Sequence, residues 1–174
     1  ETPGHAMALL HAHPEFGCVG GEYEIPTTGG IFKDVLCVGN DEVIEYFKKV
    51  FADVARIFPG KYIHIGGDEC PHERYETCPK CQKRMEENNL KSAAELQSWM
   101  TVQIAKIVTS LGKIPVGWDE VLDNTQTLGL PKEVVVMSWR GSQGGIEAAK
   151  RGHKVIMSPS IKGVYYDYRY DKSN

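Results

Sequence analysis

The sequence lacks any apolar run of the roughly 18–20 residues that are needed to cross a membrane, and no stretch has the pattern of a secretory signal peptide. Basic residues are scattered along a chain whose net charge is −3, so no nucleic-acid-binding surface is indicated. Neither the dinucleotide motif GxGxxG nor the phosphate-binding motif GxxxxGK[ST] occurs. We therefore expect no membrane or nucleic-acid partner, and no cofactor.

The composition otherwise is that of an ordinary globular protein. Of the 174 residues, 41% are hydrophobic and 25% are charged, and this length suits one domain with a substantial core. The first residue is Glu1 rather than an initiator Met. We therefore expect the chain to begin inside a longer polypeptide, and we treat residues 1–174 as part of one domain.

The five cysteines are an odd number, so they cannot all pair within the chain. A CxxC motif lies in a charged loop, but the sequence contains no second CxxC. A zinc site, a disulfide within this loop and free thiols all remain open, and we favour free thiols and predict no metal site. Cys18 and Cys37 are interpreted as small apolar residues of the core. The possible zinc ligands in the loop are Cys70, His72, Cys78 and Cys81.

Residues 62–69, with the sequence YIHIGGDE, are the stretch around which the rest is organised. An apolar, β-branched run that ends in two glycines is typical of a buried parallel strand and its turn. Asp68 and Glu69 would then lie at the carboxyl edge of the sheet, where α/β folds place catalytic groups. Adjacent carboxylates disfavour each other's ionisation, and an acid beside an anion suits glycosidic bond cleavage. The alternative is a turn whose two acids are merely solvated.

Short apolar strands alternate with amphipathic helices along the chain, which predicts a parallel sheet. Polar and aromatic side chains follow successive strands, as in a (β/α)₈ barrel. The alternative, an open doubly wound sheet, would usually show a glycine-rich phosphate turn. Residues 17–40 and 70–91 are expected to be long loops, the first of them on the surface. The predicted strands are 62–65, 113–117, 134–138 and 154–158, and the predicted helices are 41–58, 93–111 and 144–151.

Trp118 and Trp139 each come directly after a predicted strand. A flat apolar ring beside carboxylates suits a sugar, because the ring packs on the CH-rich face while polar groups bind the hydroxyls. Either ring could instead fill the top of a barrel. Since two tryptophans stand at equivalent strand ends, we favour contact with a ligand.

Several motifs in this order resemble the catalytic domain of family-20 glycoside hydrolases, the β-N-acetylhexosaminidases. The resemblance covers essentially the whole chain. It implies a (β/α)₈ barrel that removes terminal, non-reducing N-acetylglucosamine or N-acetylgalactosamine with retention of configuration. It also implies that the acetamido oxygen of the substrate, rather than an enzyme side chain, attacks the anomeric carbon. The motifs are PGH at 3–5, HIGGDE at 64–69, GWDE at 117–120, SWRG at 138–141 and YYD at 165–167.

The resemblance also implies the roles of individual residues. Glu69 corresponds to the general acid, which later acts as the base that activates water, and Asp68 to the group that orients the acetamido N–H and stabilises the positive charge. His5 matches a histidine near the general acid, and we expect it to tune Glu69.

Four further residues are implied as contacts of the bound N-acetylhexosamine. Tyr165 corresponds to a hydrogen-bond donor to the acetamido oxygen, and Asp167 to a residue that holds sugar hydroxyls. Trp118 and Trp139 correspond to walls of the acetamido pocket.

A full barrel takes about 250 residues, so the resemblance implies a partial barrel from the end of strand 3 through strand 7. The N-terminal strands and the last strand would lie outside this chain. We expect the chain alone to be inactive, and to need the rest of its barrel or to self-associate. By resemblance the parent protein would be bacterial and secreted, periplasmic or cell-surface. The alternative is a non-catalytic sugar-binding homologue or scaffold, against which the intact Asp68–Glu69 pair argues.

Overall fold

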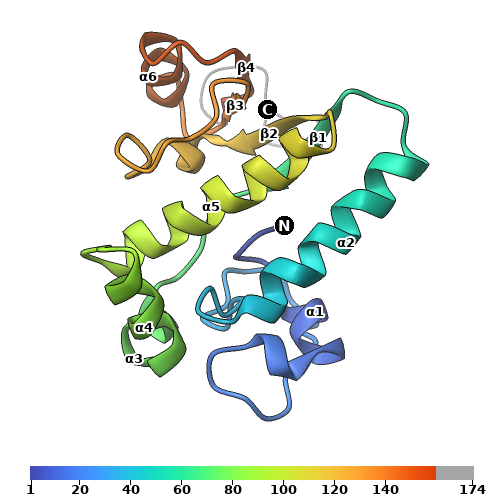
Figure 1. Ribbon diagram of the computed structural model, residues 1–174, viewed down its shortest axis with the longest axis vertical. Helices are drawn as coiled ribbons and strands as arrows, with labels where there is room; N and C mark the ends of the chain where they lie inside the picture. Colours follow the sequence, from blue (N-terminus) through green and yellow to red (C-terminus); the bar gives the residue numbers. More distant parts are fainter. Residues whose placement is uncertain (160–174) are drawn as a thin grey trace, which may run out of the picture.

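The computed structural model describes residues 1–159, which form an α/β fold around one parallel sheet (Figure 1). The strands lie in the order β1-β2-β3-β4, and all three neighbouring pairs are parallel, as the sequence predicted. Tyr165 and Asp167 lie outside the described residues. The strands are β1 (Tyr62–Gly66), β2 (Ile114–Trp118), β3 (Val135–Ser138) and β4 (Val155–Met157).

Helices connect the strands and cover the sheet. In Figure 1, α5 runs beside α2 and crosses β1 and β2, while α6 lies next to β3 and β4. Among residues 1–159, none of the helices combines the length and the hydrophobicity that a membrane-spanning helix requires. The helices are α1 (Met7–Ala12), α2 (Asp41–Ile57), α3 (Glu73–Thr77), α4 (Pro79–Glu87), α5 (Ala93–Ser110) and α6 (Gln143–Lys150), with 3₁₀ turns η1 (Pro14–Phe16) and η2 (Asp119–Leu122).

The two long helices, α2 and α5, begin at side-chain caps. The Asn40 side chain accepts a hydrogen bond from the Glu42 N–H, and Ser92 accepts one from the Glu95 N–H. The Glu95 carboxylate accepts from the Lys91 N–H, one residue before the cap, so the reciprocal bond of a standard capping box is displaced. These caps fix where each helix starts relative to the strand that follows it.

Strand β1 is buried on one face only in the described chain, whereas the sequence predicted a buried strand. Ile63 and Ile65 are buried, while Tyr62 and His64 on the opposite face are exposed. The strand alternates because α5 packs against it on the side of the isoleucines. The other face of the sheet stays open beside β1 in the described chain.

Both predicted loops differ from the expectation, the first in its burial and the second in its secondary structure. In the 17–40 segment, residues 35–38 are completely buried rather than on the surface. In the 70–91 segment, two short helices, α3 and α4, replace the expected loop. The dense charges there had concealed an amphipathic pattern, because Tyr75 and Cys81 face inward between charged residues.

Candidate active site

The backbone after β1 turns sharply and carries two acidic side chains to the carboxyl edge of the sheet. Gly66 and Gly67 have φ of 82° and 102°, which non-glycine residues rarely adopt. A Cβ on Gly67 would also lie 2.7 Å from Cγ1 of Val121 in η2. Glu69 has φ of 45°, an uncommon value for a residue with a side chain and one that is often found at functional sites. The glycines therefore allow the turn that positions Asp68 and Glu69.

The N-terminal residues lie alongside this turn. Thr2 forms a parallel bridge with Gly66, and its hydroxyl donates to the Ile65 carbonyl at 2.8 Å. Gly4 approaches the turn closely, since a Cβ there would lie 3.0 Å from the carbonyl oxygen of Asp68. This contact explains the glycine of the PGH motif, and it places the following histidine over the acidic pair.

His5 bridges the two carboxylates. Its Nε2 lies 3.3 Å from Oε2 of Glu69 and 3.4 Å from Oδ2 of Asp68. The three side chains come from segments more than sixty residues apart, and the fold brings them together as the resemblance implied. A protonated or N–H-bearing Nε2 can donate to either carboxylate.

Asp68 is the more buried member of the pair, with 14% of its side chain exposed. Burial, followed by the charge of the nearby Glu1 carboxylate, raises the pKa of Asp68 to about 6, and His5 opposes this rise. Sequence reasoning attributed such a shift to the adjacent Glu69, but the causes are burial and Glu1. The Oδ1 atom of Asp68 is buried without a hydrogen-bond partner among residues 1–159. At neutral pH the site therefore presents a carboxylate oxygen that is free to accept a hydrogen bond.

Two tryptophans line the ends of the neighbouring strands. The ring centroids of Trp118 and Trp139 are 6.3 Å apart with an interplanar angle of 68°, an edge-to-face arrangement. His64, on the open face of β1, lies with its ring centroid 4.8 Å from that of Trp118. The tryptophans are therefore brought together as predicted, and their contact with a ligand stays a prediction.

Asp119 stabilises the turn after β3 by accepting hydrogen bonds from the two residues that follow the strand, a role that sequence reasoning missed. Its side chain is 1% exposed, accepts from the Trp139 N–H at 3.2 Å and pairs with Nε of Arg140 at 2.5 Å. Gly144 makes room for it, since a Cβ there would lie 2.4 Å from Oδ2 of Asp119. The signal was present in the sequence, because an acid in GWDE and an arginine in SWRG follow neighbouring strands.

Glu120 is a second functional candidate to which the sequence assigned no role. Its Oε2 accepts a hydrogen bond from Nε1 of Trp139 at 2.9 Å. Burial raises the pKa of Glu120 to about 7, while the Trp139 bond and Arg140 lower it. Glu120 thus fixes the plane of the Trp139 ring, and it also changes charge close to neutral pH.

A cavity of about 270 Å³ lies beside these groups, between the end of β1, helix α5 and η2. Glu69, Glu120 and Arg140 line it together with Gln97 of α5. Gln97 donates to the Gly67 carbonyl at 3.0 Å, so it also supports the turn that carries the acidic pair. Nothing in the sequence singled out Gln97, because its role depends on how α5 packs against the turn.

The described residues contain two groups whose side chains could hold a metal ion. One is the His5, Asp68 and Glu69 cluster, and the other consists of four cysteines. The cysteine group corrects the sequence interpretation in two ways. Cys18 and Cys37 are not isolated apolar residues, and neither Cys70 nor His72 belongs to the group. The four members are Cys18, Cys37, Cys78 and Cys81.

The two residues that are excluded from the cysteine group have other partners. Sγ of Cys70 lies 3.6 Å from the Tyr75 hydroxyl, and Nε2 of His72 lies 2.6 Å from Oε1 of Gln97. Both therefore belong to the packing around the acidic turn.

Comparison with protein families and sequences points to one group. A model for the catalytic domain of glycosyl hydrolase family 20 matches residues 1–174. A Beta-hexosaminidase of Porphyromonas gingivalis is 46% identical over 168 residues, which are 97% of this chain and 21% of that protein. A Beta-hexosaminidase of Akkermansia muciniphila is 30% identical over 171 residues, which are 97% of this chain and 34% of that protein.

Solved structures give the same picture. The crystal structure of a chitobiase of Flavobacterium johnsoniae is similar with a TM-score of 0.83 at 36% identity, over 91% of this chain and 25% of that one. A β-N-acetylhexosaminidase of Bacteroides fragilis is similar with a TM-score of 0.79 at 31% identity, over 92% of this chain and 32% of that one. The chain thus spans between a fifth and about a third of the length of these relatives.

Proposed function

Because the chain belongs to glycosyl hydrolase family 20, we propose that its protein removes terminal, non-reducing β-linked N-acetylglucosamine or N-acetylgalactosamine from glycans. The reaction retains configuration and uses the acetamido oxygen of the substrate as its nucleophile. The chain covers only part of its relatives, so this activity is proposed for the whole protein, with residues 1–174 supplying the acidic pair.

The observation that carries the proposal is the buried, unpartnered Oδ1 of Asp68. A buried acceptor without a donor costs free energy, and such costs persist at sites that are completed by a ligand. The acetamido N–H of the substrate is a donor of the required kind. By accepting it, Asp68 would turn the acetamido oxygen toward the anomeric carbon. Its negative charge would then stabilise the oxazolinium cation as that cation forms.

Glu69 performs the proton transfers in this scheme. It gives its proton to the glycosidic oxygen as the bond to the anomeric carbon breaks, and it then takes a proton from the water that opens the oxazolinium ring. His5, whose Nε2 is 3.3 Å from Glu69, orients the carboxyl group between these steps. The positive φ of Glu69 is consistent with a side chain held in place for this purpose.

The two tryptophans form the wall against which the sugar packs. Trp139 is fixed by its bond to Glu120, and Trp118 by its packing against Trp139 and His64. A rigid aromatic surface beside carboxylates is suited to the N-acetyl group and the CH-rich face of the ring. From the resemblance alone, Tyr165 and Asp167 complete the contacts to the acetamido oxygen and the hydroxyls.

We further propose that residues 1–174 are one segment of a (β/α)₈ barrel, in a bacterial protein that is secreted, periplasmic or at the cell surface. Thr2 pairs in parallel with the end of β1, at the position that a preceding barrel strand would occupy. Large apolar side chains on β1 and β4 are exposed, as expected where further strands and barrel-filling side chains belong. They are Tyr62, Ile156 and Met157.

The test is Glu69→Gln in the longest polypeptide that the gene encodes. Turnover of an N-acetylglucosamine disaccharide should fall by about 10²–10⁴, because its sugar leaving group needs protonation. Turnover of an aryl N-acetylglucosaminide with an acidic phenol should fall far less. Glu73→Gln, an exposed carboxyl group four residues further along, is the matched control and should behave as wild type. Equal losses on both substrates would rule out Glu69 as the acid, and a wild-type protein that binds these sugars without turnover would support a non-catalytic homologue.

A further inference from the structure

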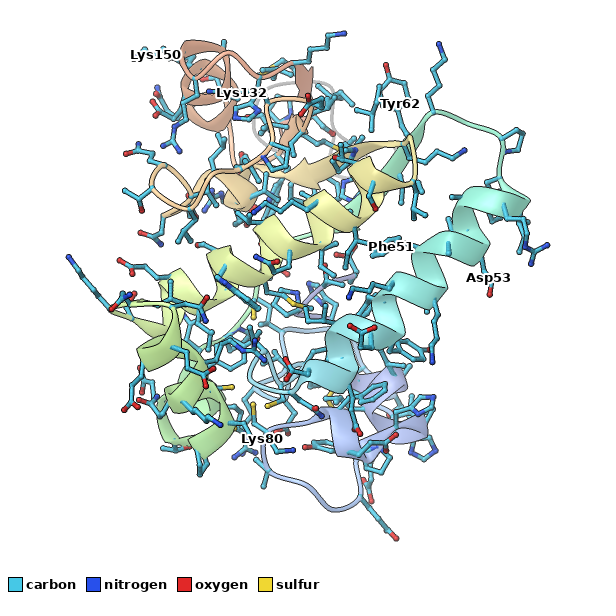
Figure 2. All side chains as sticks on the ribbon, viewed as in Figure 1. Phe51, Asp53, Tyr62, Lys80, Lys132 and Lys150 are labelled. Atoms are coloured by element: carbon cyan, nitrogen blue, oxygen red, sulfur yellow. The ribbon has the colours of Figure 1, made fainter. Side chains whose placement is uncertain are left out.

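Four cysteines from three separate segments meet at one point of the fold. Their Sγ atoms all lie within 4.8 Å of one another. Cys37 lies 3.7 Å from both Cys78 and Cys81, and Cys18 lies 3.8 Å from Cys81. The cluster joins the 17–39 segment to the beginning of α4, where Lys80 is labelled in Figure 2 between α4 and the N-terminal part of the chain.

The spacing of these sulfurs matches a metal site rather than disulfides. A tetrahedral zinc ion with Zn–S bonds of about 2.3 Å holds its sulfurs about 3.8 Å apart. A disulfide would bring two sulfurs to about 2.0 Å. All four thiols are free, and their shortest separations are those of the tetrahedron.

Two backbone segments of the cluster, one after Cys37 and one at the start of α4, lie very close to each other. A Cβ on Gly39 would lie 2.1–2.4 Å from the carbonyl carbon and oxygen of Lys80 and from the amide nitrogen of Cys81. Only glycine therefore allows the segment after Cys37 to lie on the first turn of α4. Pro79 occupies the first position of that helix, so the CxxC motif spans a fixed turn.

The burial of the cluster indicates a structural site. Cys37, Cys78 and Cys81 are buried and Cys18 is half-buried. Four protein ligands fill a tetrahedral shell, which leaves no position for water or substrate. An ion there would fix loops in place and would take no part in the chemistry at Asp68 and Glu69.

We propose that Cys18, Cys37, Cys78 and Cys81 bind one Zn²⁺ ion as a tetrathiolate. The four thiols release their protons on binding, so the site carries a net charge of −2. Tetrahedral sulfur ligation suits zinc or iron, and zinc(II) binds more tightly than iron(II) to the same ligands. This inference is independent of the proposed hydrolase activity.

The site is connected to the acidic turn through Tyr75 of α3. The Tyr75 hydroxyl donates to the carbonyl of Leu36, next to Cys37, at 3.1 Å, and it lies 3.6 Å from Sγ of Cys70, next to Glu69. Zinc binding would therefore hold α3, which follows Glu69 in the chain, against the 17–39 segment.

The experiment measures metal content in the longest polypeptide that the gene encodes, purified without chelator and without oxygen. Elemental analysis should find one zinc per chain, and X-ray absorption should find four sulfur neighbours at about 2.3 Å. Cys81→Ser and Cys18→Ser should each lose most of the zinc. Cys70→Ser is the matched control, because it removes a cysteine outside the cluster and should keep the full amount.

Several results would overturn the proposal. They include wild-type protein without zinc, an iron-loaded site with the colour of iron thiolates, oxygen or nitrogen neighbours in the absorption spectrum, and zinc that persists in both serine variants of the cluster. Alkylation and mass spectrometry on protein taken directly from its native compartment test the redox state, and disulfides among the four cysteines would also count against the site. The wild-type measurements decide the question even where a variant does not fold.

Discussion

Replacing Asp68 with asparagine tests the proposed catalytic role of this carboxylate separately from its cost to the stability of the folded protein. The change keeps the size of the side chain and removes the charge. It also places an NH₂ group where either Oδ2, near His5, or the unpartnered Oδ1 now lies. If Asp68 accepts the acetamido N–H and stabilises the cation, the variant loses a preorganised electrostatic partner. Such losses are typically about 10²–10³ in rate, or about 3–4 kcal/mol of transition-state stabilisation.

The same substitution should make the folded protein more stable at neutral pH. Burial and the nearby Glu1 carboxylate together raise the pKa of Asp68 from 3.8 to about 6, and a rise of about two pH units corresponds to at most about 3 kcal/mol. Below pH 3.8 both folded and unfolded states hold the proton, so the charge costs nothing. As the pH rises from about 4 to about 6, the folded wild type loses stability, and above pH 6 the full cost is present. The stability gained in Asp68→Asn should therefore appear over this window and then level off.

The assays are thermal unfolding and kcat/KM, each followed from pH 4 to pH 8 on the full-length protein. In the wild type, kcat/KM should fall as the pH drops below about 6, because protonated Asp68 is a weaker acceptor for the N–H and carries no charge to stabilise the cation. In Asp68→Asn this limb should be absent. Asp53→Asn, on the exposed face of α2 (Figure 2), is the control and should leave both profiles unchanged. Activity within threefold of wild type, or a variant less stable at every pH, would refute the reasoning.

Three further predictions concern the support of the site. Asp119→Asn should lower stability by about 1–3 kcal/mol and reduce turnover, because it weakens the buried contacts that hold Arg140, and an unchanged unfolding midpoint would contradict this. Gly39→Ala should lower the unfolding midpoint, because the added methyl group forces the first turn of α4 away from the segment after Cys37. Gly29→Ala is the control and should leave the midpoint unchanged, because Gly29 has open space around it. Equal midpoints for the two variants would show that the close approach of Gly39 to α4 is unimportant. Residues 1–174 expressed alone should turn over no N-acetylhexosaminide and should self-associate through open sheet surfaces, so an active monomer by light scattering would refute the barrel-segment proposal.

Local patterns predicted the sheet and the main helices well, because the physical signals there are local. The apolar run before Gly66 and the side-chain caps at Asn40 and Ser92 each act within a few residues, and so does Gly112, which follows the end of α5 with φ of 72°. The acidic pair was predicted for the same reason, since a strand followed by a glycine turn and two acids fixes where those acids lie. Short buried helices in a charged segment, such as α3, depend on one inward residue, Tyr75, and gave no comparable signal.

Contacts between distant segments were the part that sequence reasoning could not supply. The pKa of Asp68 was attributed to its sequence neighbour Glu69, whereas it depends on burial and on Glu1. The possible zinc ligands were chosen by their proximity in the chain, which selected Cys70 and left out Cys37. In the structure Cys37 belongs to the cluster and Cys70, 33 positions further along the chain, does not. Proximity along the chain predicts contacts within a helix turn or a loop, but it says little about which loops fold onto one another.

Two parts of the structure position the acidic pair, Asp68 and Glu69. One is the sheet, and the other is a loop group that consists of the N-terminal segment, the 17–39 loop and α3. The sheet fixes the backbone of Asp68 and Glu69 through the turn after β1. His5, by contrast, lies in the N-terminal segment, which continues into the 17–39 loop and is tied to α3 by the pair between Arg74 and Asp34 at 2.7 Å. If the cysteines bind zinc, that loop group is stabilised independently of the sheet. Removing the metal should then impair the position of His5 and the rate of turnover before it affects the unfolding of the sheet.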